Sequence, residues 1–168
     1  MNLAGAIGLV FPLVMVAAMI TDARRFEIPN SLPLALVLAW PVVAVAGDLP
    51  GLQIAWACAI ACGLLLLGIA LYAFAILGGG DAKLIAAAAL WTGAGETGSF
   101  LLYTALLGGL VALGVMLARH QTLLPAALAR RTLVTRLRGE AHVPYALAIG
   151  PAGLLVYPRL PFALGLFG

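Results

Sequence analysis

The chain is a series of long apolar stretches separated by short breaks of polar residues, glycine or proline. The apolar stretches cover residues 3–20, 32–46, 52–77, 82–92, 99–118 and 143–166. A helix of about 20 apolar residues spans a bilayer, so the pattern predicts an all-α polytopic membrane protein, a bundle of six transmembrane helices. The segment 82–92 is short. It rises only about 16 Å as a helix, and must be buried among its neighbours or extend through the glycines beside it.

The breaks between these segments have the composition of loops and turns. The first, residues 21–30, reads Thr-Asp-Ala-Arg-Arg-Phe-Glu-Ile-Pro-Asn, and we expect a polar loop there. Asn30 or Ser31 is the expected cap of the helix that follows. Three further breaks are predicted turns, at 47–51, 78–80 and 93–98.

Composition supports the membrane class. Of the 168 residues, 64% are hydrophobic and 9% are charged, with a mean hydropathy of +1.15. Soluble domains carry about 25% charged residues. The length allows one transmembrane domain over residues 1–168 and no sizeable soluble domain. No Lys or Arg precedes segment 3–20 and no obvious cleavage site follows it, so we expect a retained helix and not a signal peptide.

Basic residues gather in alternate loops. The loops 21–31, 78–83 and 119–142 contain Lys and Arg, whereas the turns 47–51 and 93–98 contain none. The excess of positive charge in cytoplasmic loops therefore predicts that the first three face the cytoplasm, with the amino terminus outside. The extended basic loop 119–142 is compatible with an amphipathic helix on the membrane surface. No aromatic residues alternate with the basic ones as in a nucleic-acid surface, so we expect no nucleic-acid partner.

This orientation places two aspartates at the same membrane face. Asp22 follows the first apolar segment, and Asp81 follows three glycines. A carboxylate at the edge of a bilayer is costly and is a candidate functional residue. Two carboxylates about 3 Å apart share a proton, so one can activate a water while the other protonates a peptide carbonyl. We therefore interpret the pair as an intramembrane aspartic protease centre.

Other interpretations of the aspartates remain open from the residues alone. Asp81 can cap the helix that it begins and pair with Lys83, and Asp22 can be an interface residue beside two arginines. In function, the alternatives are a small transporter or channel, in which the aspartates are proton or cation ligands, and a non-catalytic subunit of a pilus or secretion assembly. A transporter predicts carboxylates near the bilayer midplane. A structural subunit predicts that both aspartates can be replaced without loss of function.

The remaining candidate ligands indicate no metal site or cofactor. Cys58 and Cys62 share a helix face but form no C-x-x-C pair, so a zinc ribbon is excluded and packing residues are expected. His120 and His142 flank the basic loop without the spacing of metal ligands.

Two motifs resemble those of a known family. Residues 78–84, Gly-Gly-Gly-Asp-Ala-Lys-Leu, resemble the G-x-G-D-x-K-L motif of the type IV prepilin peptidases, which are bacterial membrane aspartic proteases. Asp22 followed by Ile-Pro-Asn at 28–30 is similar to the first motif of that family. His-Val-Pro-Tyr-Ala at 142–146 resembles the start of its last helix. The resemblance covers nearly the whole chain, in the family's order.

The resemblance implies cleavage of the short basic leader of prepilins, at the cytoplasmic face of the bacterial inner membrane, by a catalytic pair of Asp22 and Asp81. The implied partners are the lipid bilayer and a prepilin with a basic leader and a hydrophobic helix. The residues expected to shape the site or bind substrate are Gly78, Gly79, Gly80, Lys83, Pro29 and Asn30.

The chain differs from the larger members of this family in one respect. Those members carry two C-x-x-C pairs in a cytoplasmic domain and also methylate the new amino terminus, and this chain has no such pairs. It resembles the short, peptidase-only form of Flp-type (tight-adherence) pili, and methyltransferase activity is not expected. Which prepilin or related precursor is cleaved, and the oligomeric state, stay open.

Overall fold

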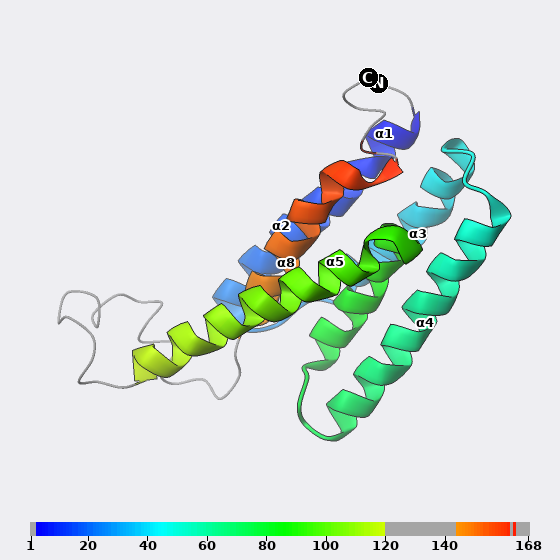
Figure 1. The fold of residues 1–168 in the computed structure, drawn as a ribbon. Helices are drawn as coiled ribbons and strands as arrows, with labels where there is room; N and C mark the ends of the chain where they lie inside the picture. The colour runs from blue at the N-terminus through cyan, green and yellow to red at the C-terminus, as the bar shows by residue number, and fades with distance from the viewer. Residues whose placement is uncertain (1–2, 120–143, 162, 164–168) are drawn as a thin grey trace.

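The computed structural model describes residues 3–119, 144–161 and 163, and all regular elements in this part are helical (Figure 1). The helices are α1 (Leu3–Gly8), α2 (Val10–Arg25), α3 (Ser31–Ala46), α4 (Gly51–Ala73), α5 (Gly79–Arg119), α8 (Ala146–Val156) and the 3-10 helix η1 (Tyr157–Arg159). The predicted all-α class is therefore confirmed. The basic loop 119–142 lies outside the described residues apart from Arg119, which ends α5, and so do both histidines.

Three helical stretches are long and apolar enough to cross a membrane: Gly5–Arg25, Gly51–Ala73 and Gly79–Leu117. Helix α3 is apolar but shorter. Their outer faces carry large exposed side chains such as Leu66, which is 68% exposed, and lipid is the natural cover for such a surface. The chain thus has the character of a membrane protein, and the number of six spans stays a prediction.

The first polar break is shorter than predicted, because α2 continues to Arg25. Nothing in residues 21–25 opposes a helix, and the predicted loop 21–30 is reduced to 26–30. Phe26 ends the helix in a left-handed conformation (φ 54°), and its N–H donates to the carbonyl oxygen of Asp22 at 2.8 Å. Asp22 consequently projects from the last turn of a helix and not from a loop.

Helix α5 consists of two arms that meet at Gly93. Its backbone there (φ 55°, ψ −165°) is not helical, and Figure 1 shows the second arm turning back from the first. The turn predicted over 93–98 is made by Gly93 alone, because this conformation is open to glycine and the residues after it are helical. Thr97 donates to the carbonyl of Gly93, and its hydroxyl lies 2.7 Å from that of Thr92, so side chains bridge the break.

The first arm of α5 is the centre of the bundle. It begins at Gly79, and residues 86–91 are buried, so the short segment predicted from sequence both extends through the glycines and packs among its neighbours. Trp91 donates its indole N–H to the carbonyl of Leu36 at 2.9 Å, which ties α5 to α3. Phe11 of α2 stacks on Tyr157 with ring centroids 6.0 Å apart and lies 5.6 Å from the ring of Trp91.

Glycines allow the helices to approach one another closely. A Cβ at Gly153 of α8 would lie 2.9 Å from Sδ of Met15, and a Cβ at Gly68 of α4 would lie 2.7 Å from Cβ of Ala82. Small residues at such contacts are typical of helix packing in membranes. These contacts hold α8 against α2, and α4 against the start of α5, and so position the two ends at which the aspartates lie.

Candidate active site

Asp22 lies in the last turn of α2 and is 5% exposed. Its Oδ2 accepts a hydrogen bond of 2.8 Å from the backbone N–H of Ala146, the first residue of α8. The first N–H groups of a helix have no partner within the helix, and they bind negative charge. The start of α8 therefore holds the carboxylate of Asp22 in one orientation.

Asp81 lies in the first turn of α5 and is partly exposed. Its carboxylate folds back onto the glycine run and accepts a hydrogen bond from the backbone of Gly78. A Cβ at Gly78 would lie only 2.6 Å from Oδ2 of Asp81. The absence of a side chain at Gly78 is thus what allows the carboxylate to take this position.

The two aspartates lie in the same region, at the end where α2 finishes and α5 begins. Asp81 is close enough to Asp22 for the two carboxylates to interact electrostatically. Gathering two like charges in apolar surroundings costs stability, and such arrangements are concentrated at functional sites and not at packing contacts. The two aspartates of the sequence analysis thus lie in one region, and their role as a catalytic pair stays a prediction.

The segments around the two aspartates also contact each other. A Cβ at Gly80 would lie 3.0 Å from Cβ and 3.3 Å from the carbonyl oxygen of Ile28, so only glycine fits here without displacing the Ile-Pro-Asn turn. Lys83 Nζ donates to Asn30 Oδ1 at 2.9 Å across 53 residues. Asn30 occupies the position before α3, but its side chain makes no capping hydrogen bond and bonds Lys83 instead.

Not every residue predicted for the site contributes in the same way. Gly79 faces α4, where its Cβ would lie 3.4 Å from Cε2 of Tyr72. Pro29 accepts the N–H of Leu32 at 3.1 Å and so begins the turn into α3. The sequence did not predict that Ile28 and Tyr72 contact the glycines. It also did not predict that the backbone of Ala146 binds Asp22. The resemblance of 142–146 to a family motif was a signal for Ala146, whereas nothing in the sequence indicated Tyr72.

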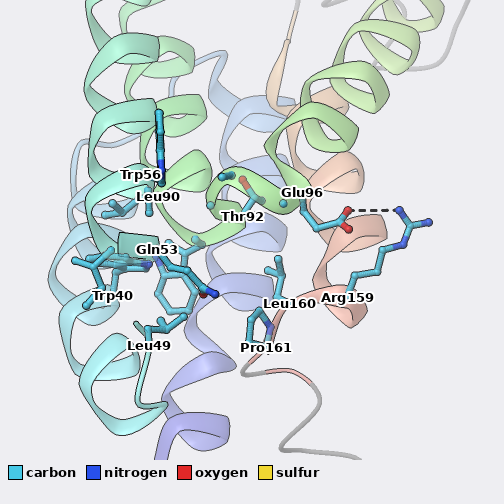
Figure 2. Close-up of a pocket in the computed structure, with 16 residues that line it drawn as sticks. Trp40, Leu49, Gln53, Trp56, Leu90, Thr92, Glu96, Arg159, Leu160 and Pro161 are labelled. Atoms are coloured by element: carbon cyan, nitrogen blue, oxygen red, sulfur yellow. Dashed lines mark hydrogen bonds and ion pairs between the residues drawn. The ribbon is translucent and has the colours of Figure 1, made fainter. Parts of the chain in front are cut away.

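A separate cavity of about 370 Å³ lies at the other end of the bundle. Figure 2 shows Trp40, Trp56 and Leu90 on one side of it, and the ion pair of Glu96 and Arg159, at 3.4 Å, on the other. Gly93, which lines the cavity, is separated from Asp81 by the length of the first arm of α5. At the rise of an α-helix this length is about 20 Å. This cavity is therefore not part of the aspartate site.

No group of three or more His, Cys, Asp or Glu side chains is arranged to hold a metal ion in the described part of the chain. The site thus consists of two carboxylates, a glycine strip without side chains and one lysine–asparagine pair. Such an arrangement supplies groups that can exchange protons with water, beside a partly exposed backbone without side chains.

Comparison with known proteins gives the family. Curated proteins and solved structures gave no significant match. Residues 9–113 match the model of the type IV leader peptidase family, a range that includes both aspartates, the Ile-Pro-Asn turn and the glycine motif. Because the match covers well over half of the 168 residues, the chain belongs to the type IV leader peptidase family.

Proposed function

We propose that this leader peptidase is an aspartic endopeptidase that removes the basic leader of Flp-type prepilins at the cytoplasmic face of the bacterial inner membrane. The observation that carries the proposal is the contact between the segments that follow Asp22 and surround Asp81, at Gly80 with Ile28 and at Lys83 with Asn30, which brings the two aspartates into one region. Two carboxyl groups in one apolar region are typical of a functional site, and peptide hydrolysis is the reaction of the family.

In the proposed reaction one aspartate is ionised and the other is protonated. The ionised carboxylate takes a proton from a water molecule, whose oxygen attacks the scissile carbonyl carbon, while the protonated carboxyl group donates its proton to the carbonyl oxygen. When the tetrahedral intermediate collapses, the C–N bond breaks, the aspartate that took the proton from water gives it to the leaving nitrogen, and the other aspartate regains a proton from a hydroxyl group of the intermediate. The hydrogen bond from Ala146 to Asp22 orients one of the two acids for these transfers.

We propose that the scissile segment of the substrate binds along the glycine strip, residues 78–80. Residues 78–80 carry no side chains and are partly exposed beside Asp81, so an extended peptide can pair with the backbone groups that Tyr72 and Ile28 do not cover. The Lys83–Asn30 hydrogen bond keeps this strip against the turn that follows α2. We assign the pair a positioning role and not a role in the proton transfers.

The same residues argue against the transporter alternative. Its carboxylates are expected near the middle of the bilayer, whereas Asp22 is in the last turn of α2 and Asp81 in the first turn of α5. We also propose that the chain does not methylate the new amino terminus, because it lacks the two C-x-x-C pairs of the larger members.

The test is cleavage of a prepilin in proteoliposomes by the wild type and by Asp22→Asn and Asp81→Asn. Loss of a general acid or base lowers the rate by about 10²–10⁴-fold, and we expect at least that for each variant. Asp48→Asn is the matched control, because Asp48 is exposed in the turn between α3 and α4, far along the chain from both motifs. Full activity in either Asp22→Asn or Asp81→Asn would refute the catalytic pair, and normal pilus assembly by both would favour a structural subunit.

A further inference from the structure

A second hollow, of about 530 Å³, lies between α3, α4 and α5. Its walls are apolar, formed by Leu34 and Val37 of α3 and by Cys62 and Leu65 of α4, and its floor is the first arm of α5. The two polar side chains that line it, Asn30 and Lys83, lie together at one end. We call this hollow the α3–α4 groove.

The α3–α4 groove begins at the candidate active site. Its polar end is the Lys83–Asn30 hydrogen bond, and Lys83 is two residues from Asp81. Asn30 is two residues from Ile28, which contacts Gly80. From Lys83 the floor continues to Leu90, seven residues further and about 10 Å deeper along the axis of α5. A bound peptide that runs from the glycine strip into the groove therefore passes from the polar end of the groove to its apolar interior.

The shape and chemistry of the groove fit one face of an apolar helix. Its floor includes Ala86 and Ala87, which are small and allow a second helix to pack closely, as small residues do at helix contacts in membranes. Helix α4 packs along α5, and α3 packs against α1, α2 and α5, so the space between α3 and α4 is not filled by either helix. The volume is enough for several side chains of a helix that lies partly in lipid.

We propose that the α3–α4 groove receives the first turns of the apolar helix that follows the leader in the substrate. The amino-terminal end of that helix lies at Asn30 and Lys83, so the preceding peptide bond reaches the glycine strip and Asp81. Recognition then combines an apolar helix in the bilayer with an extended scissile segment outside the groove. This inference rests on the proposed leader peptidase function and adds the surface that selects the substrate.

The natural cysteine Cys62 lies in the groove, is exposed and provides a direct test. In an Asp81→Asn, Cys58→Ser background, which retains an uncleaved substrate, the enzyme carries Cys62 alone. The probe is a synthetic precursor with a basic leader, a scissile glycine and an apolar helix of roughly 20 residues that has one cysteine in its first two turns. Both are reconstituted in liposomes and oxidised with copper–phenanthroline.

The control moves the enzyme's cysteine to Gly63, with Cys62→Ser and Cys58→Ser in the same background. Gly63 is at nearly the same depth in α4, does not line the groove, and a Cβ there meets nothing within 4 Å. We expect a disulfide to the probe that forms several-fold faster at Cys62 than in the Gly63→Cys protein. Equal rates at both positions, or a covalent dimer of the enzyme at Cys62, would overturn the inference.

A second test uses a substitution that blocks the groove. Val37→Trp adds a large ring on the α3 wall, where Val37 is 44% exposed, and we expect a several-fold rise in KM for the membrane-spanning precursor. Val42→Trp is the matched control on the same helix, because Val42 is 45% exposed and does not line the groove. Equal KM values for the two variants, with a wild type that cleaves the precursor, would refute the groove and leave the proposed function intact. A wild type that does not cleave would refute the function itself.

Discussion

The backbone N–H of Ala146 donates a hydrogen bond of 2.8 Å to Oδ2 of Asp22, across 124 residues of sequence. The start of α8 thus orients a carboxylate in the last turn of α2. The region matched to the leader peptidase family ends at residue 113, so this contact comes from outside it. The candidate site is therefore built from three separated parts of the chain, and each part can be tested separately.

The first test asks whether activity depends on the position of the Asp22 carboxylate. Asp22→Glu keeps the negative charge but moves the carboxylate by one methylene, away from its bond to Ala146. A misplacement of about 1 Å can lower a rate by about 100-fold, and we expect a loss of kcat of that order in the prepilin cleavage assay. Wild-type kcat in Asp22→Glu would show that this geometry is not required.

Gly78→Ala tests the position of Asp81. The new Cβ would be placed 2.6 Å from Oδ2 of Asp81, so the carboxylate must rotate away from the backbone of Gly78. A side-chain rotation is tolerated by the fold, and we expect a large fall in kcat with little change in thermal stability. Gly63→Ala is the control, because a Cβ at that site meets nothing within 4 Å. A fall in stability as large as the fall in activity would instead indicate a packing role.

The hydrogen bond between Lys83 and Asn30 is suited to a double-mutant cycle. Lys83→Met and Asn30→Ala each remove one partner, and for this exposed pair we expect a change of about 0.5–1.5 kcal/mol in the activation free energy from kcat/KM. Because both variants lose the same bond, the double variant should be no worse than the more affected single variant. Strictly additive losses would mean that the two residues act independently.

Gly93→Ala tests the break in α5. Gly93 has φ 55° and ψ −165°, a conformation that is essentially confined to glycine, and alanine there should destabilise the fold by about 1–3 kcal/mol. Two residues further on, Gly95 is helical and a Cβ meets nothing within 4 Å, so Gly95→Ala should be neutral or stabilise by up to about 1 kcal/mol. Unfolding in detergent with rising denaturant measures both. Equal effects of the two substitutions would contradict a special role for Gly93.

The pattern along the chain was sufficient to predict the class of the protein, and it named candidate residues for the site, whose roles stay a prediction. Apolar segments of bilayer length predicted an all-helical membrane protein, and alternating charge in the loops predicted that Asp22 and Asp81 share one end. Hydropathy and charge can be read locally in this way because the bilayer acts on each segment separately. The glycines before Asp81 likewise indicated a close approach, since only a residue without Cβ permits one.

Tertiary structure decided which atoms meet. The side chain of Asn30 was predicted as a possible helix cap, but it bonds Lys83, and the partner of Asp22 is a backbone N–H of Ala146. Residues 21–25 of the predicted loop became the last turn of α2, and the reversal in α5 needed only Gly93. Contacts across 53 or 124 residues depend on how helices rotate and cross, which is set by interdigitation of side chains over the whole bundle. No local pattern records that rotation, and the sequence alone therefore names the two aspartates without showing what holds them.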